Sequence, residues 1–170
     1  MTVGAGVTVT PVARHASRPD QRKSGAYPKA TASQLAQLRL ERQERLLGER
    51  NIHLWAVIDE AALHRQVGGT QVMREQIGKL IELKELDDVT VQVLPFSAGA
   101  HVGQNGAFSI MEFADPESPA VVYQETLISN AYLEEPSDVE RYRMAYDQLR
   151  AAGLSPAASV ALMARIQTAL

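Results

Sequence analysis

The stretch VTVQVLPFSAGAHVGQNGAFSIMEF, residues 89–113, decides the fold predicted for this chain. Val89, Val91 and Val93 alternate with polar residues, which is typical of a β-strand with one buried face. Pro95 ends this strand because proline has no N–H to donate to a ladder. A second strand-like run, AFSIMEF, follows the glycine-containing loop. The stretch therefore predicts two strands joined by a connection longer than a tight hairpin, and both a functional loop or lid and a plain connector remain open for it.

The segments before this stretch predict a parallel pair of strands. The run IHLWAVID, residues 52–59, is typical of a buried strand, and EAALHRQV predicts a short helical turn that ends at two glycines. The segment TQVMREQIGKLIELKEL then has its apolar residues on one helical face, with Thr70 as the expected cap. Because strands 52–59 and 89–94 flank a helix, they form a βαβ unit. A further helix is predicted around residues 33–48.

The segments after it predict antiparallel strands and two helices. AVVYQET and ISNAYLEE are the two expected strands. Ser137 and Glu140 have the spacing of a capping box at the start of one helix, and Ser155 with Pro156 predicts the start of the last. The predicted fold is an α/β or α+β domain, whose mixed β-sheet contains one βαβ unit plus antiparallel strands, with packed helices.

Composition excludes several classes of function. The 170 residues contain no cysteine, so disulfides, thiolate catalysis and Cys-ligated zinc are excluded. The net charge of −3 carries no overall nucleic-acid signature. No signal peptide or apolar run of membrane-spanning length is present in the sequence, so a cytoplasmic protein without membrane association is expected.

The chain divides into two parts. Residues 1–33 are rich in Gly, Pro, Ser and Thr and carry five basic residues against one acidic residue, so we expect a disordered basic arm. Residues 34–170 are expected to form a single regulatory-type α/β domain. Apolar residues in the terminal helices, 137–152 and 156–169, predict a homodimer.

The loop between the strands predicted at VTVQVL and AFSIMEF holds the main candidate for chemistry, His101. It lacks the GxxxxGK[ST] and GxGxxG patterns, so phosphate cradling is not indicated. Ligands gather at strand ends, where Glu60 and Glu125 lie. If the protein is an enzyme, these carboxylates and His101 are its candidate acid/base residues. Two alternatives remain open, in which His101 is a hydrogen-bonded loop residue and Glu60 pairs with Arg65 within one turn.

The full set of candidate ligand-binding residues combines this loop with the strand ends: Glu60, Arg65, Phe96, His101, Tyr123 and Glu125. The separations of His53, His64 and His101 are unlike those of a compact zinc site, so no metal is predicted. No cofactor is predicted either, and Trp55 is expected in the core.

Several segments together resemble a known family. These are RLERQERLL, IDEAALHRQVGG, VMREQIGKLIEL, VTVQVLPFSAGAH, GAFSIMEF and VVYQET, which lie between about residues 36 and 165. They are similar to the C-terminal domain, of unknown function, in actinobacterial Xre-like helix-turn-helix transcriptional regulators. Members place a DNA-binding helix-turn-helix before this domain, whereas residues 1–33 here are not suited to a helical bundle.

The resemblance implies a ligand- or protein-binding regulatory domain that lacks its own DNA-binding module. Specific DNA binding by this chain alone is not expected, and the partner would be a small molecule or a protein. The alternative is a small cofactor-independent enzyme, a hydrolase, isomerase or cyclase, that uses the same pocket. A histidine and a carboxylate that converge in a pocket would favour the alternative.

Overall fold

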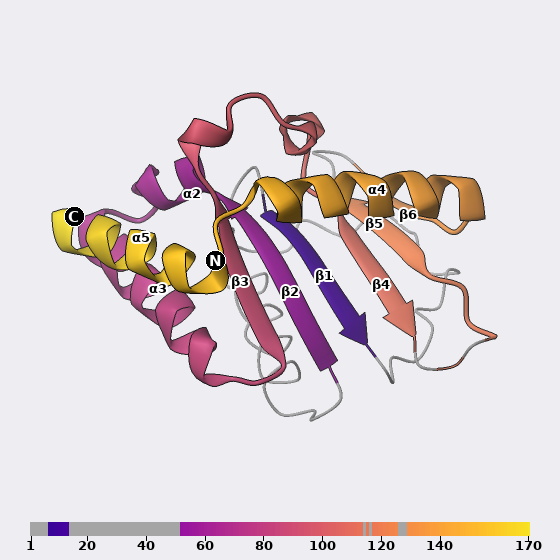
Figure 1. The fold of residues 1–170 in the computed structure, drawn as a ribbon, viewed down its shortest axis with the longest axis horizontal. Coiled ribbons are helices and arrows are strands. Elements are labelled where there is room, and N and C mark those ends of the chain that lie inside the picture. Colours follow the sequence, from indigo (N-terminus) through magenta and orange to yellow (C-terminus); the bar gives the residue numbers. More distant parts are fainter. Residues whose placement is uncertain (1–6, 14–51, 114, 116, 126–128) are drawn as a thin grey trace.

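The computed structural model describes residues 7–13, 52–113, 115, 117–125 and 129–170. Six strands form one mixed sheet in the order β3-β2-β1-β4-β5-β6 (Figure 1). Their bounds are β1 Val7–Ala13, β2 Ile52–Asp59, β3 Val89–Leu94, β4 Ser109–Phe113, β5 Val121–Glu125 and β6 Asn130–Leu133. The parallel pairing of β2 with β3, and the antiparallel pairing of β4, β5 and β6, confirm the predicted mixed α/β fold.

The connection between β2 and β3 is helical, as predicted. It contains α2, Glu60–His64, and α3, Thr70–Glu82. Gly68 and Gly69 separate them with φ angles of 82° and 93°, which a side chain with a Cβ rarely adopts. The prediction that Thr70 caps α3 is wrong, because Gly69 occupies the cap position and no side chain caps this helix.

Strand β1 was not predicted. It pairs antiparallel with β2, from Val7 opposite Ile58 to Ala13 opposite Ile52, and parallel with β4. Residues 7–13 lie within the expected disordered arm, but here they form a strand that joins β2 to β4, which are not paired with each other. The rest of the arm and the helix predicted around 33–48 lie outside the described residues.

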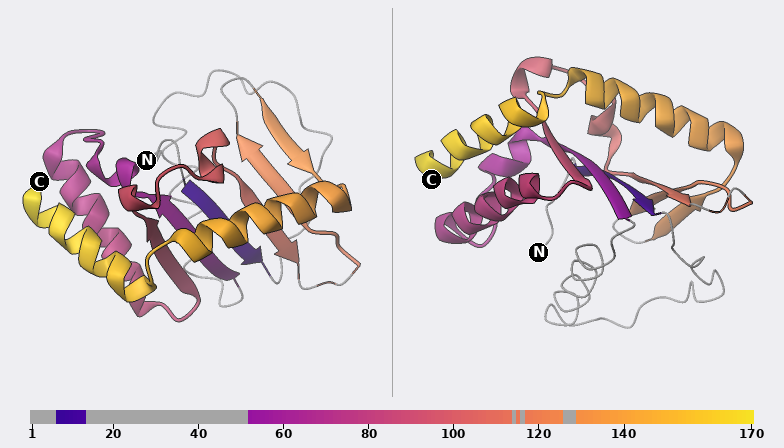
Figure 2. Two further views of the ribbon diagram at one scale, coloured as in Figure 1. Left: turned by 45° about the horizontal axis from the view of Figure 1, so that its top comes forward. Right: turned by 60° about the horizontal axis from the view of Figure 1, so that its bottom comes forward.

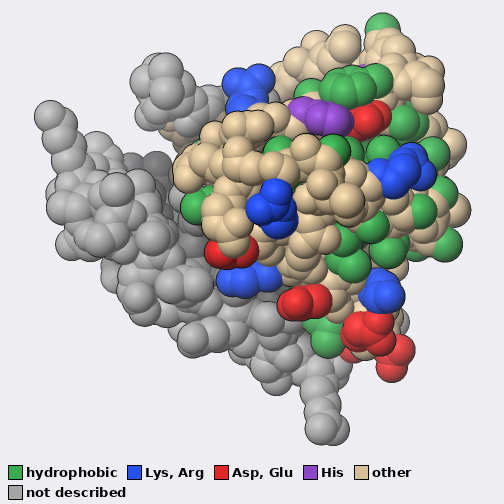
Figure 3. Space-filling view, turned by 90° about the vertical axis from the view of Figure 1, so that its left-hand side faces the viewer, with side chains coloured by type: hydrophobic (Ala, Val, Ile, Leu, Met, Phe, Trp, Pro, Cys, Tyr) green, Lys and Arg blue, Asp and Glu red, His purple; other side chains and the backbone are tan. Residues whose placement is uncertain are grey.

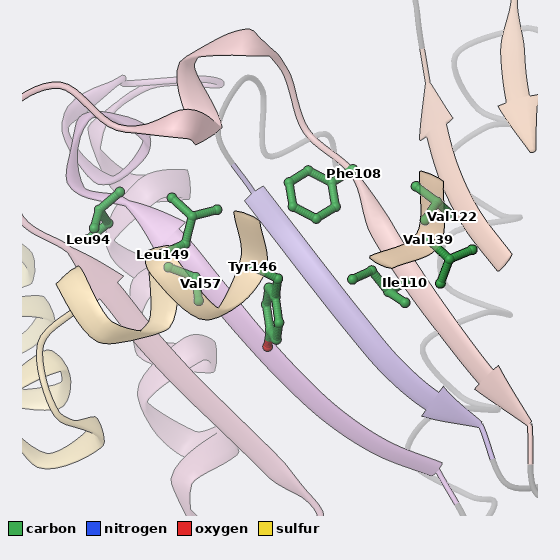
Figure 4. Packing of buried hydrophobic residues seen from close by; sticks show 8 residues of the cluster. All are labelled: Val57, Leu94, Phe108, Ile110, Val122, Val139, Tyr146 and Leu149. Atoms are coloured by element: carbon green, nitrogen blue, oxygen red, sulfur yellow. The ribbon is translucent and has the colours of Figure 1, made fainter. Parts of the chain in front are cut away.

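Helix α4, Pro136–Ala152, crosses one face of the sheet. Figure 4 shows the core beneath it, where Tyr146 and Leu149 of the helix face strand residues that include Val57 and Ile110. Trp55, expected in the core, packs at the edge of this cluster and donates its Nε1–H to Gln92 at 2.7 Å.

Helices α3 and α5, Pro156–Ala169, pack together at the β3 edge of the sheet (Figure 2). Their shared core joins Ile77 and Met163, both with no exposed surface, to Ile58 and Val93. These strand residues alternate along the chain with the residues that face α4, so the two helical groups use different faces of β2 and β3.

The two predicted caps of the C-terminal helices have different outcomes. Helix α4 begins at Pro136 after Glu135, without a side-chain cap, so the predicted capping box of Ser137 and Glu140 is wrong. Proline suits this first helical position because its missing N–H has no partner there in any case. The Ser155 cap of α5 is confirmed, because its Oγ accepts a hydrogen bond from the Ala158 N–H at 3.2 Å.

The apolar residues that suggested a homodimer are largely covered within the chain. Met163 and Ile166 belong to the buried core, and Val160 and Leu162 pack against it. They therefore do not form the free apolar surface on which the homodimer prediction rested, and the homodimer stays a prediction. Among the described helices, none combines the length and apolar character that a membrane crossing requires.

Candidate functional site

The carboxyl end of β2 holds a pair between Asp59 and His101. Asp59 is the residue before α2, and its Oδ1 accepts a hydrogen bond from the Ala61 N–H at 2.8 Å. Its Oδ2 lies 3.2 Å from the Nε2 of His101, which comes from the loop after β3. The His101 side chain is only 13% exposed and that of Asp59 22%. One carboxylate therefore caps a helix and fastens the loop at the same time.

The second ring nitrogen of His101 is closed off. Its Nδ1 is buried without a hydrogen-bond partner. Gly103 lies against the ring so closely that a Cβ there would come within 3.1 Å of Nδ1 and 3.4 Å of the Leu149 side chain. A general base must reach the proton that it abstracts. With one nitrogen on Asp59 and the other covered, this geometry favours loop attachment over catalysis for His101.

Glu60 makes a second attachment of the same loop. Its Oε2 accepts a hydrogen bond from the Phe96 N–H at 2.7 Å, and its Oε1 lies 3.5 Å from the Nε2 of His64. The expected pairing with Arg65 is not found, because Arg65 follows the last helical residue with an extended backbone, φ −80° and ψ 109°. His64, at i+4, is the residue on the face of Glu60.

Phe96 is held in place and yet exposed. Its ring stacks on His64 with 5.5 Å between the ring centroids and 26° between the planes, while 60% of the residue is exposed. Its backbone is bound by Glu60, and a short 3-10 turn, Phe96–Ala98, follows. The loop therefore presents an aromatic ring to the solvent at a fixed position beside α2.

An open hollow of about 460 Å³ lies between α2 and α5 next to this ring. Figure 3 looks onto this end of the molecule, where a histidine and an acidic side chain lie side by side among hydrophobic side chains. The hollow combines polar residues with an apolar wall, and its lining residues are Glu60, His64, Gln66, Leu162, Arg165, Ile166, Ala169 and Leu170. Its volume falls within the range of about 300–1,000 Å³ that is usual for ligand sites, but it is more open to solvent than an enclosed cleft.

Two of the predicted site residues lie elsewhere. Tyr123 and Glu125 are on β5, which is separated from β2 by β1 and β4, or about 14 Å at about 4.8 Å per strand. They also alternate with Val122, whose side chain packs under α4, and so they point away from α4, whereas Gly103 beside the His101 ring lies near Leu149 of α4. Tyr123 contacts the ring of Tyr132, 5.1 Å away between centroids. The predicted acid/base pairing of His101 with Glu125 is therefore wrong.

The three described histidines each contact one carboxylate. Besides the two pairs at the end of β2, His53 lies 2.8 Å from Asp88 near the opposite end of that strand. No group of three or more potential metal ligands is found within the described ranges. Asp59 and His64 were missed as site residues, although an aspartate at a strand-to-helix junction is a recognisable cap signal.

The chain belongs to the DUF5753 family, described as a domain of unknown function, whose family model matches residues 13–165. No curated protein and no solved structure matches the chain. The match includes both carboxylates at the end of β2 and the loop that they hold, so this arrangement lies within the family's domain.

Proposed function

We propose that this chain is a ligand-binding regulatory domain, related to the C-terminal domains of actinobacterial Xre-like helix-turn-helix regulators. The proposed binding surface is the hollow between α2 and α5 together with the ring of Phe96. The observation that carries the proposal is the fixed exposure of Phe96, which is 60% exposed while Glu60 and His64 hold it.

A fixed exposed aromatic ring supports binding for a physical reason. Leaving an apolar ring in water is unfavourable, and a partner that covers it gains the free energy of burial. Because the Phe96 side chain is already held, little of its conformational entropy would be lost when a partner binds. Aromatic residues are accordingly enriched at the centres of binding surfaces.

The alternative, a small cofactor-independent enzyme, has less support. It was based on His101 as an acid or base with a carboxylate nearby. The carboxylate that lies near is Asp59, and the remaining ring nitrogen is covered next to Gly103. Such a histidine is suited to holding the loop in the conformation that presents Phe96.

The proposal is tested by screening a metabolite and peptide library with Phe96→Ala and a matched control. Met144 is 52% exposed on α4, so Met144→Ala removes a similarly exposed apolar side chain away from the hollow. We expect the Phe96 variant to bind a ligand of the unmodified protein at least tenfold more weakly, with Met144→Ala unchanged. Equal affinities for both variants would contradict the proposal.

A further inference from the structure

We infer that the ligand of this hollow is a small carboxylate with an apolar chain, whose carboxylate is bound by Arg165. The inference rests on the proposed function, since it names the class of ligand for the same surface. Arg165 lines the hollow and is exposed to solvent. A guanidinium presents a planar fork of donors that matches the two oxygens of a carboxylate.

The pairing of the six described arginines shows which of them is free to bind a ligand. Four of the six make a hydrogen bond or an ion pair within the chain, namely Arg74, Arg141, Arg143 and Arg150. Arg65 and Arg165 are the two whose side chains make no such interaction in the described part of the chain. Arg165 lines the hollow, and Arg65 lies in sequence between two lining residues, His64 and Gln66. Of these two arginines, Arg165 is thus the one that offers an unpaired guanidinium to a ligand in the hollow.

Glu60, the acidic side chain that lines the hollow, does not occupy the guanidinium of Arg165. Glu60 is 14% exposed, and its two oxygens are already directed to the Phe96 N–H and to His64. Its negative charge nevertheless remains close by, so a dianion such as a phosphate monoester would be repelled more than a monoanion. A carboxylate is a monoanion and fits both conditions.

The other lining residues favour a ligand with an apolar chain. Leu162, Ala169 and Leu170 provide partly or fully exposed aliphatic side chains beside Arg165, and Ile166, which is 6% exposed, lies behind them in the core. Covering the exposed side chains is favourable in proportion to the apolar area removed from water. A charged head without an apolar chain would leave these side chains in water, and an uncharged chain would leave Arg165 without its partner.

The test uses octanoate as the probe in an NMR titration that follows the backbone amides of α2 and α5. Octylamine, octanol and acetate separate the contributions of charge and chain. We expect octanoate to shift these amides at lower concentration than the other three compounds. Arg165→Gln should weaken octanoate about tenfold or more, which is the usual loss for a charge-assisted hydrogen bond. Arg141→Gln is the control, because Arg141 is 77% exposed on α4 and also paired with an aspartate.

The outcomes separate this inference from the proposed function. If octylamine or octanol shifts the same amides as strongly as octanoate, the hollow binds ligands but the assigned chemistry is wrong. An affinity for octanoate that Arg165→Gln leaves unchanged likewise overturns the inference. If no probe shifts these amides, the inference also falls, and the library screen with Phe96→Ala decides separately whether the surface binds anything.

Discussion

Replacing His101 with alanine is expected to destabilise the fold, although a loop histidine ordinarily contributes little to stability. The ring is 13% exposed and bonds to Asp59 at 3.2 Å, while Gly103 packs against its other side. A buried hydrogen bond to a charged acceptor contributes about 1.5–3 kcal/mol, and the lost ring packing adds to this. Because Asp59 keeps 22% exposure and water can replace part of the bond, we expect a loss of about 2 kcal/mol.

The chain contains a matched control for this experiment. His53 also bonds an aspartate, Asp88, at the shorter distance of 2.8 Å, but the two side chains are 46% and 42% exposed. Exposed ion pairs contribute about 0–1 kcal/mol, because solvent screens the charges and both side chains lose freedom. His53→Ala should therefore cost at most about 0.5 kcal/mol, so the comparison tests whether burial or distance sets the strength of the pair.

The measurement is urea unfolding followed by circular dichroism. With a urea m-value of about 2 kcal/mol/M, a loss of about 2 kcal/mol lowers the midpoint by about 1 M while the slope stays constant. Equal midpoints for His101→Ala and His53→Ala would refute the reasoning. If His101→Ala leaves the midpoint unchanged and abolishes ligand binding, the residue contacts ligand, and its assignment to loop attachment is wrong.

Three further predictions concern the stability of the fold, and one concerns DNA binding. Gln92→Ala should cost about 1–3 kcal/mol, since it leaves the Trp55 Nε1–H without its acceptor at 2.7 Å; thermal unfolding measures this loss. Ile77→Ala should cost about 2–5 kcal/mol in urea unfolding, whereas Val72→Ala, at a 39% exposed position, should cost under about 1 kcal/mol. Ser155→Ala removes the cap of α5 and should cost about 1 kcal/mol by calorimetry, while Ser155→Asp should restore it. In gel-shift assays the chain should bind DNA weakly and without sequence preference, with less binding as salt increases; tight selective binding at physiological salt would contradict this.

The sequence predicted most of the fold because much of the pattern is local. Alternating valines predicted β3, and the apolar face of the segment that follows Gly69 predicted α3. Strand β1 was missed although its run VTVTPVA is rich in β-branched residues, which favour strands. Its proline and the composition around it favoured a disordered arm, and only pairing with strands far along the chain places it within the sheet.

The candidate site was predicted in part. Of the candidate residues, Glu60, Phe96 and His101 lie close to one another at the end of β2. Glu125 was also placed at a strand end, but the order of strands in the sheet separates it from the others. Strand order depends on contacts between distant segments, and no local pattern in the sequence contains that information.

The choice between Asp59 and Glu60 as partner of His101 shows why residue types alone could not settle the chemistry. The two carboxylates are adjacent in sequence, yet Asp59 ends the strand and Glu60 begins the helix, so their side chains leave in different directions. Asp59 meets the histidine of the loop, and Glu60 meets the Phe96 backbone 36 residues away. The loop is thereby held at two points, and this double attachment leaves Phe96 exposed while it covers the nitrogen that catalysis by His101 would need. Binding through Phe96 requires an exposed ring, whereas catalysis through His101 requires an accessible ring nitrogen. The loop conformation exposes the Phe96 ring and covers the Nδ1 of His101, so it suits binding better than catalysis.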